Sequence, residues 1–342
     1  LSNPEDIKIG FESTAHYALN LELFLENAHH SFMEVNPVLI KEYKKSTTLR
    51  RTKTDSVDCE SIARWLMTVE YKPHSKGFYH AYSLKSLTRL RDRLIRQRSF
   101  YLVKITNVLD HTFPEFKPFF NERLSKTALY LLENYGSAEK MARMNSASYD
   151  KLRCISRGKF SIQQFLRLKE LAANTVGVNN SIFDLELNTL LTLYKSLSDE
   201  INTLETEIIK LIEEVHPHYM SIPGIGPISA AVIYAEYGDI SNFSNPGQML
   251  AFAGIEPGIN DSGTESHGGR MVKHGSSQLR YVLLNSCLPL IRFDLTFATY
   301  YAKKRAEGKK HRVAITHVAK KLIRVIYALE RQDVDFNVQK LR

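Results

Sequence analysis

Apolar side chains repeat at helical spacing over most of the chain and follow strand-like patterns only near its start. Residues 7–12 read IKIGFE and residues 31–35 read SFMEV, and each run is followed by a helical pattern. A strand, helix, strand, helix order favours a parallel sheet, in which ligand groups gather at the carboxyl ends of the strands. The pattern therefore predicts an N-terminal α/β domain over residues 1–80.

Two long stretches, residues 83–110 and 181–215, carry leucine and isoleucine at helical spacing, and shorter helical patterns lie between them. Two long helices separated by a smaller helical insert predict an antiparallel coiled-coil arm over residues 81–215. We assign these apolar stripes to structure rather than to chemistry. The arginines on the first long helix either touch a nucleic-acid backbone or form a solvated face.

The remaining residues, 216–342, predict a mainly helical C-terminal domain. Its first motif, SIPGIGPISAAVIYAEY at residues 221–237, is a Pro-Gly-x-Gly turn that opens a helix. The turn resembles the hairpin of helix–hairpin–helix DNA-binding modules, whose backbone amides hold phosphate without reading sequence. Gly224 and Gly226 are therefore candidates for nucleic-acid binding. Plain helix packing through small residues is the alternative.

The stretch from Met249 to Ser286 begins apolar, opens at Gly254 into a loop rich in Gly, Ser, Asn and Asp, and closes into an apolar helix from about Ser277. Glycines let a backbone approach a ligand closely, and hydroxyls and cations on such a loop suit phosphate. An ordinary surface loop is the alternative. The candidates for phosphate or nucleic-acid binding here are His267, Arg270, Lys273 and Arg280.

Three carboxylates are candidates for a metal site. Asp55 and Asp58 are spaced i, i+3 at the start of a predicted helix, so they share one face of its first turn, and Glu12 ends the first predicted strand. Their convergence would form a hard-cation site for Mg²⁺ with room for phosphate oxygens. Alternatively, Asp55 caps the helix, Asp58 complements its dipole and Glu12 is an exposed strand end.

Composition narrows the class of protein. The 342 residues are 43% hydrophobic and carry a formal net charge of +9, and basic clusters at 41–53 and 303–312 favour a polyanionic partner over a merely solvated face. The three cysteines show neither disulfide nor metal-ligand spacing, which fits a reducing compartment. No apolar run approaches the roughly 20 residues needed to span a bilayer. We expect a cytoplasmic protein without membrane association.

Several sequence blocks resemble one known family. These blocks are GFESTAHY, VNPVLIKEYKKS, LRRTKTDSVDCESIARWL, SIPGIGPISAAVIYAEYGDISNF and FAGIEPGINDSGTESHGGRMVKHGSSQLRYVLLNS. They resemble the transposases of insertion sequences that carry a DEDD-type, RuvC-like domain, the bridge-RNA-guided recombinases. The resemblance covers nearly the whole chain, although the helical middle is similar only in character.

The resemblance implies a RuvC/RNase H-like domain that binds Mg²⁺ through four acids, of which Glu12 matches the second and Asp55 and Asp58 the closing pair. It also implies a serine nucleophile, Ser262, that attacks DNA and forms a covalent phosphoserine link, with Ser266 as its rival. The implied partners are DNA and a structured guide (bridge) RNA. The family further implies a homo-oligomer, a dimer or tetramer, in a bacterial or archaeal cell.

One departure from the family concerns its first acidic residue, which has no match here. That residue belongs on a strand before IKIGFE, so we expect an N-terminally incomplete RuvC-like domain, and Asp6 precedes the strand rather than ending one. Three hypotheses follow: an RNA-guided DNA recombinase, a RuvC-like metal-dependent junction endonuclease without a serine step, or a catalytically dead nucleic-acid-binding relic that uses the PGIG turn and the basic clusters.

Overall fold

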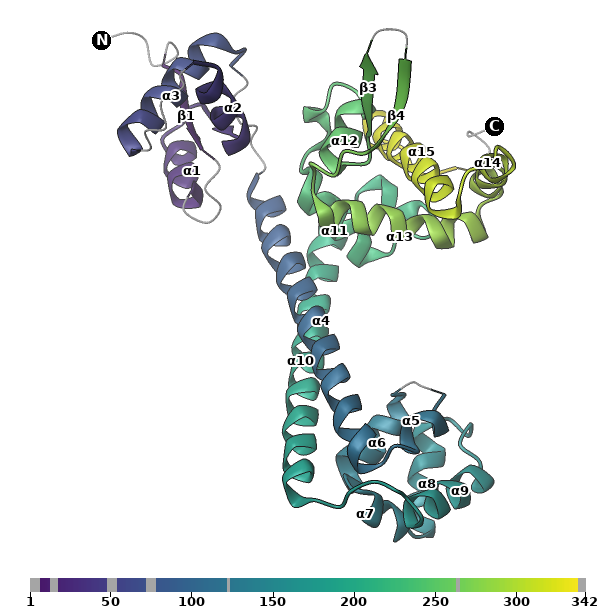
Figure 1. The fold of residues 1–342 in the computed structure, drawn as a ribbon. Helices are drawn as coiled ribbons and strands as arrows, with labels where there is room; N and C mark the ends of the chain where they lie inside the picture. Colours follow the sequence, from purple (N-terminus) through teal and green to yellow (C-terminus); the bar gives the residue numbers. More distant parts are fainter. Residues whose placement is uncertain are drawn as a thin grey trace. The chain divides into compact units, whose positions relative to one another are not determined.

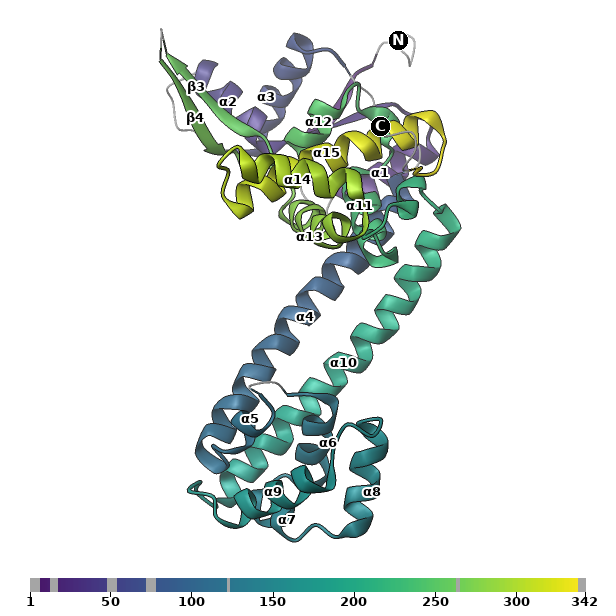
Figure 2. The ribbon, with the colours of Figure 1, turned by 90° about the vertical axis from the view of Figure 1, so that its right-hand side faces the viewer.

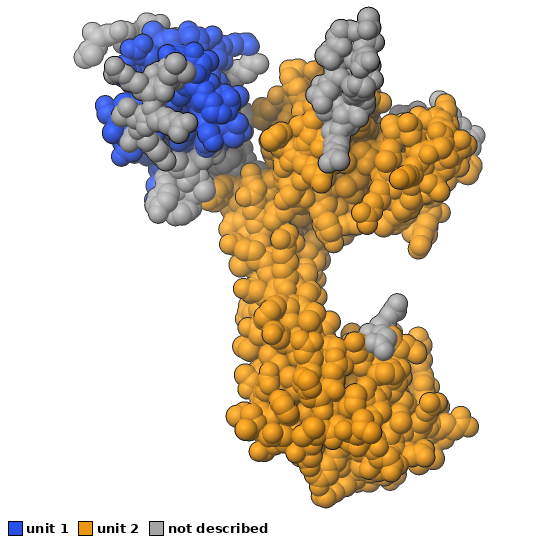
Figure 3. Space-filling view, in the orientation of Figure 1, with its two compact units in different colours: residues 1–78 blue, residues 79–342 orange. Residues whose placement is uncertain are grey.

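The chain is mostly helical and divides into two compact units. Unit 1 is Leu1–Phe78 and unit 2 is Tyr79–Arg342 (Figure 3). The computed structural model describes residues 7–12, 18–47, 54–71, 78–121, 124–262 and 265–337. The three-part division into 1–80, 81–215 and 216–342 stays a prediction.

Unit 1 contains a two-stranded parallel sheet. β1 (Ile9–Glu12) pairs with β2 (Phe32–Val35), with Ile9 opposite Phe32 and Glu12 opposite Val35, so the predicted parallel pairing is confirmed. Buried Val35, Ile40 and Leu66 form its core cluster. The helices of unit 1 are α1 (Ala18–Asn27), α2 (Pro37–Thr47) and α3 (Asp55–Thr68).

Two long helices dominate the first part of unit 2. α4 (Phe78–Thr112) and α10 (Ser181–Val215) run side by side in opposite directions (Figures 1 and 2). Arg91 on α4 donates to Glu205 on α10 at 2.5 Å, which links the two helices at this point. Both predicted long helices are therefore confirmed, while their supercoiling stays a prediction.

The segment between the long helices folds into short helices around its own core. Ser161 and Gln164 form a reciprocal capping box at the start of one of them, which satisfies backbone amides that the helix itself leaves free. Buried Ile105 and Leu187 of the long helices join Leu131 in this core. The short helices are α5 (Phe116–Phe119), α6 (Lys126–Tyr135), α7 (Ala138–Ala142), α8 (Ser146–Ile155) and α9 (Ile162–Ala173).

The C-terminal part of unit 2 has a second, larger core, to which Leu84 of α4 and Ile208 of α10 also belong. Its last helix presents one face to this core, including Val318, Leu322 and Ile326, which are fully buried. The elements are η3 (His218–Ser221), α11 (Pro227–Tyr237), η4 (Ile240–Asn242), α12 (Pro246–Ala253), β3 (Pro257–Ser262), β4 (Glu265–Met271), α13 (Ser277–Phe293), α14 (Leu295–Ala306) and α15 (His311–Gln332).

An ion pair joins the long helices to this C-terminal part. Arg89 on α4 donates from Nε to Glu236 Oε1 at 2.9 Å and from a terminal nitrogen to Oε2 at 3.1 Å. The Glu236 side chain on α11 is only 2% exposed. A two-pronged contact of this kind fixes the angle between two helices as well as their distance.

The structure bears on two further features, the membrane-spanning potential of the helices and the surroundings of the three cysteines. In the part of the chain that the structure describes, no single helix is long and apolar enough to cross a membrane, whereas one pair, α13 with α14, passes the same test together but is bent by 106°. Cys59 and Cys154 are exposed free thiols. Cys287 is buried, and burial raises the pKa of its thiol to about 12.

Candidate functional site

The three predicted metal ligands lie on two elements of unit 1. Glu12 is the last residue of β1, and Asp55 and Asp58 lie in the first turn of α3. Thr54 caps that helix by accepting a hydrogen bond from the Val57 amide, so Asp55 is not the capping residue. The cap at the start of α3 therefore does not require Asp55, whereas both aspartates lie in the first turn, where they can complement the helix dipole.

α3 packs against β1. The Lys8 ammonium donates to the Leu66 carbonyl, and a side chain added at Gly10 would meet the end of Leu66 at 2.5 Å. The start of β1 thus lies against the end of α3. Whether the first turn of α3 lies beside Glu12 stays a prediction.

The described carboxylates do not form a complete metal centre. Among the described residues, no group of three or more His, Cys, Asp or Glu side chains could hold a metal ion. Asp58 Oδ1 instead contacts the ammonium of Lys44 on α2, and both side chains are about a quarter exposed. The convergence of Glu12, Asp55 and Asp58 on one ion stays a prediction.

Sequence reasoning missed a buried carboxyl in the same unit. Glu22 on α1 is 3% exposed, and burial first, then the charges of Glu34 and Glu26, raise its pKa to about 7. The signal was present in the sequence: Glu22 lies on the buried stripe of α1 between Ala18 and Leu25, where the helical period calls for an apolar residue.

Ser262 is the last residue of β3 in a β-hairpin. The expectation of a loop from Gly254 to Ser277 was wrong, because residues 257–262 and 265–271 pair as antiparallel strands, with Asp261 opposite Ser266 and Ser262 opposite Glu265. Alternation in this stretch was hidden by its many small residues, which are poor strand formers. The predicted helix start at Ser277 is confirmed.

The other predicted residues of this stretch lie on or just after the hairpin. In the backbone register His267 pairs with Asn260. Arg270 belongs to β4, and Lys273 follows it as an exposed residue. Arg280 is half-buried and donates to the Ala253 carbonyl at 3.2 Å, so it holds the end of α12. Roles of these side chains in nucleic-acid binding stay predictions.

The two glycines of the PGIG turn differ in their surroundings. Gly224 has a φ of +99°, and a side chain there would meet Pro289 at 2.9 Å and the Ser286 carbonyl at 3.0 Å, so it must remain glycine for α13 to pack. Gly226 is the N-cap of α11 with a φ of −79°, and a side chain there would meet nothing within 4 Å. Packing explains Gly224 but not Gly226.

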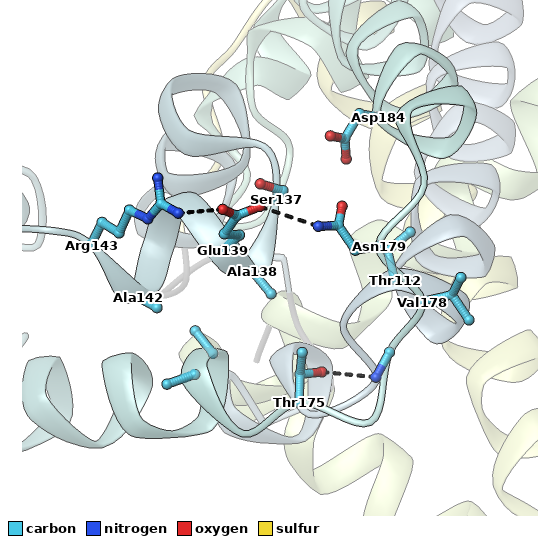
Figure 4. Close-up of a pocket in the computed structure, with 13 residues that line it drawn as sticks. Thr112, Ser137, Ala138, Glu139, Ala142, Arg143, Thr175, Val178, Asn179 and Asp184 are labelled. Carbon is cyan, nitrogen blue, oxygen red and sulfur yellow. Dashed lines mark hydrogen bonds and ion pairs between the residues drawn. The ribbon is translucent and has the colours of Figure 1, made fainter.

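The structure has a hollow in unit 1 and another among the short helices of unit 2. One, of about 760 Å³, runs along β1 and α3 of unit 1 and is lined partly by Phe11, Ile62 and Met67. The other, of about 320 Å³, lies between α7, α9 and the start of α10 (Figure 4), where Glu139 pairs with Arg143 and accepts from Asn179. Neither hollow is lined by a predicted site residue.

Two segments of the chain match family models of transposases. A family model described as "Transposase IS116/IS110/IS902 family" matches residues 217–302, and the DEDD transposase model of IS110, described as "Transposase", matches residues 1–114. Residues 217–302 contain Ser262 and the PGIG turn, and residues 1–114 contain all three predicted carboxylate ligands.

Individual relatives agree with these matches. The chain is 29% identical over 237 residues to a 43.6 kDa protein of insertion element IS110 from Streptomyces coelicolor, an alignment that covers 67% of this chain and 58% of the relative. It is 28% identical over 298 residues to a 42 kDa protein of insertion element IS900 from Mycobacterium paratuberculosis, covering 82% and 71%. It is 25% identical over 260 residues to the transposase for insertion sequence element IS1111A from Coxiella burnetii, covering 75% and 59%.

The chain thus spans less than two thirds of the length of the IS110 and IS1111A relatives. Within that span, the order of the matched segments is the order of the sequence blocks quoted above, with the acidic segment first and the serine-bearing segment second. Residues 217–302 are thus similar to the IS110/IS116/IS902 family of transposases, and residues 1–114 are similar to the DEDD transposase domain of IS110.

Proposed function

We propose that this chain cuts and rejoins DNA of an insertion sequence through a serine nucleophile, Ser262, assisted by the carboxylates Glu12, Asp55 and Asp58. The observation that carries the proposal is the pair of family matches, because one segment contains the serine and the other contains the acids. A transposase needs both a group that opens the phosphodiester and charges that stabilise the phosphate during transfer.

The serine step conserves the energy of the phosphodiester bond. The Ser262 hydroxyl oxygen attacks phosphorus, its proton passes to a base or to water, and the bond from phosphorus to one sugar oxygen breaks. That oxygen takes up a proton and leaves as a hydroxyl. Attack by another sugar hydroxyl reverses the sequence, frees Ser262 and rejoins DNA without an external energy source.

Serine is a weak nucleophile, so this step needs activation by a base, a cation or a metal. His267, Arg270 and Lys273 are close to Ser262 in sequence and are our candidates for phosphate binding or proton transfer. His267 lies across from Asn260 in the hairpin register, two pairs away from Ser262. Because His267 and Ser262 are near each other in the pairing of the two strands, His267 is the first residue to test for proton transfer.

The carboxylates suit a divalent cation in chemical type. Glu12, Asp55 and Asp58 supply only oxygen, which is the ligand that Mg²⁺ prefers, and Lys44 already supplies a positive charge to Asp58. Bound Mg²⁺ would supply stabilisation of negative charge on the transferring phosphate. We expect Lys44 to release Asp58 when a metal ion binds there.

The partners of the reaction are part of the same proposal. We propose that a structured RNA selects the DNA by base pairing, and that the serine and the carboxylates of one complete site come from different subunits of a dimer or tetramer. The sequence blocks that resemble bridge-RNA-guided recombinases support both points. The net charge of +9 is compatible with two polyanionic partners.

The test is to trap a covalent protein–DNA adduct on a denaturing gel, using the full chain, labelled DNA carrying the element ends, the guide RNA and Mg²⁺. Ser262→Ala should abolish the adduct. Ser266→Ala is the matched control, since it also removes a serine hydroxyl. Ser266 lies on the paired strand, next to Glu265, the residue opposite Ser262. Asp58→Asn should reduce the adduct at least 100-fold if its charge stabilises transfer, in line with the loss of one electrostatic stabiliser.

Each result separates the hypotheses. An adduct that persists in Ser262→Ala and disappears in Ser266→Ala would move the nucleophile to Ser266. Cleavage without any adduct, abolished by chelating Mg²⁺, would replace the recombinase with a metal-dependent junction endonuclease. Binding without cleavage under every condition, unaffected by chelation, would leave only a nucleic-acid-binding protein.

A further inference from the structure

The last long helix, α15, presents a basic stripe to solvent. Its buried face includes Ala314, Val318 and Leu322, and a row of positions beside that face is partly or fully exposed. Those positions carry His317, Lys320, Lys321 and Arg324. Because the residues are spaced three or four apart, they form one continuous row on the helix surface.

The stripe is not balanced by acids on its own helix. From His311 to Leu329 the sequence of α15 contains no Asp or Glu. Lys304 and Lys309, from the end of α14 and the turn that follows it, add positive charge near His317. Among the described residues, three acids act near the stripe: Glu307 pairs with Lys304, and Glu256 and Asp294 act on Lys320 and Lys321.

The charges on the stripe destabilise one another. Burial first, and then the repulsion from Lys320, Lys304 and Lys309, lower the pKa of His317, and burial and Arg324 lower that of Lys320. Cations held this close cost free energy unless a counter-charge lies over them. A bound polyanion would supply that counter-charge.

Part of the stripe is held in place by aromatic rings. The Lys321 ammonium lies 5.1 Å from the centroid of the Phe297 ring and 5.2 Å from that of Tyr300, both on α14. Cation–π contacts of this kind restrict a long side chain without neutralising it. Lys321 therefore remains a positive charge at a fixed place between the two helices.

The stripe also lies close to the hairpin that carries Ser262. Glu256 directly precedes β3, and the charge of its side chain acts on Lys320. Its backbone carbonyl accepts a hydrogen bond from the Val272 amide at 2.9 Å, which closes the foot of the hairpin. Both views show α15 beside the foot of β3 and β4 (Figures 1 and 2). A strand held along the stripe would therefore run toward the hairpin.

We propose that His317, Lys320, Lys321 and Arg324, with Lys309 of the preceding turn, bind the phosphate backbone of duplex DNA and lead it to the foot of the β3–β4 hairpin. The choice of DNA rests on the proposed function, whereas the surface itself goes beyond it. From His317 to Arg324 the helix rises about 10 Å, which matches about three successive phosphates along one strand. Such contacts position DNA without reading its sequence.

The first experiment measures DNA binding by the full chain without cleavage. The labelled duplex is followed by fluorescence anisotropy in Ca²⁺ at several salt concentrations. The variant Lys309→Gln/Lys320→Gln/Arg324→Gln should lower the slope of log affinity against log salt by about 2 to 3, because each lost phosphate contact removes about 0.9. Affinity at 0.1 M salt should fall by at least tenfold.

A matched control removes the same charge elsewhere in unit 2. Lys151→Gln/Arg153→Gln/Lys195→Gln replaces three exposed cations on α8 and α10 and should leave the slope within about 0.5 of the parent protein. Equal slopes for the two triple variants would overturn the proposal. A slope that changes for structured RNA of equal length and not for DNA would reassign the stripe to RNA.

A pH series gives an independent readout. Phosphate near His317 should raise its pKa against the opposing effects of burial and of Lys320, Lys304 and Lys309, and Glu307 acts in the same direction as phosphate. DNA should therefore bind more tightly as pH falls from 7.5 to 5.5, by up to about tenfold for each pKa unit gained. His317→Gln should flatten this dependence, and an unchanged dependence would exclude His317 from the contact.

These outcomes do not depend on catalysis. If no covalent adduct forms with Ser262 present, the salt slopes still report whether the stripe binds DNA. If adducts form normally while the stripe variant has an unchanged salt slope, the proposed function survives and the stripe assignment fails. A melting curve for each variant confirms that the exposed substitutions leave the helix folded.

Discussion

Unit 1 and the C-terminal part of unit 2 differ sharply in how much apolar surface they bury. In unit 1 the core cluster consists of Val35, Ile40 and Leu66, while Phe24 is 65% and Met67 81% exposed. In unit 2 the C-terminal core draws fully buried residues from α10, α11, α13 and α15. Since apolar burial is the main favourable term in folding, unit 2 should hold most of the stability.

This comparison suggests that the side chains of unit 1 depend more on a bound metal ion for a fixed position than those of unit 2. The three predicted metal ligands belong to the unit with the small core, so neighbouring packing fixes them weakly. The hairpin with Ser262, in contrast, is attached to α12 and α13 of the large core, with the Ser276 amide donating to the Phe252 carbonyl at 3.1 Å at its foot. We therefore expect metal to stabilise unit 1 more than unit 2.

The largest expected effect is a cavity in the large core. Leu322→Ala on α15 should lower the free energy of unfolding of unit 2 by about 2–5 kcal/mol, because Leu322 is fully buried. Urea unfolding followed by circular dichroism reports mainly this helical unit. The single tryptophan, Trp65 on α3, reports unit 1 separately by its fluorescence.

The control for this substitution is Leu288→Ala on α13, where the side chain is 45% exposed and the cost should stay below about 1 kcal/mol. The Trp65 transition should not move in either variant. If Leu322→Ala shifted both transitions equally, the two units would unfold together and their separate cores would not determine their stabilities.

The next effect concerns the ion pair between α4 and α11. Arg89→Met should cost about 3 kcal/mol, because it leaves the buried Glu236 carboxylate without its partner. Glu236→Gln should cost less, since the remaining Arg89 side chain is 47% exposed and stays hydrated. Equal costs for the two variants, measured by urea unfolding, would mean that burial of Glu236 does not govern the pair.

A matched comparison is available two residues further along α4. Arg91 and Glu205 form the same kind of contact between α4 and α10, but both side chains are a quarter to a third exposed. Arg91→Met should therefore cost only about 1 kcal/mol. The difference between Arg89→Met and Arg91→Met isolates the contribution of burial.

Much of the helical fold was predictable, because long apolar stripes leave few alternatives. The stripe from Ser181 to Val215 predicts a helix with the bounds that α10 has, ended by His216 and Pro217. The hairpin of residues 257–271 was not predictable in this way. Its strands are rich in Gly, Ser and Asn, whose weak strand preference is overcome by pairing that depends on the whole fold.

The candidate site was predictable in residue type but not in contacts. The Asp-x-x-Asp spacing at Asp55 and Asp58 correctly predicts two carboxylates on one helical turn. No pattern indicates that Lys44, from another helix, contacts Asp58, or that Arg280 holds the end of α12. Contacts between distant segments follow from packing, and spacing along the chain does not encode them directly.

A smaller effect is the pH dependence of unit 1. The pKa of Glu22 is raised to about 7 in the folded chain from a usual value of 4.5, so the folded state binds more protons between those values. The stability of unit 1 should therefore fall as pH rises from about 4.5 to 7, by roughly 1–3 kcal/mol, and then level off. Trp65 fluorescence during urea unfolding measures this change.

Glu22→Gln removes the titrating group with little change in shape and should flatten the curve. Glu26→Gln on the same helix is the control, because Glu26 is only partly buried and contributes only as the least of the causes that raise the Glu22 pKa. A curve that keeps its full slope in Glu22→Gln would assign the pH dependence to another carboxyl group.

The smallest effect on stability, that of Gly226→Ala at the PGIG turn, gives the sharpest functional test. Gly224→Ala should destabilise unit 2 by about 1–3 kcal/mol, because the residue has a positive φ and lies against Pro289. Gly226→Ala should change stability by less than about 1 kcal/mol, since its backbone suits alanine and the added methyl group meets nothing.

If the turn binds phosphate through close backbone approach, Gly226→Ala should nevertheless weaken DNA binding several-fold in the anisotropy assay. Unchanged affinity in a protein of unchanged stability would remove the turn from the DNA-binding surface, and the basic stripe of α15 would then have to account for the affinity of this part of unit 2.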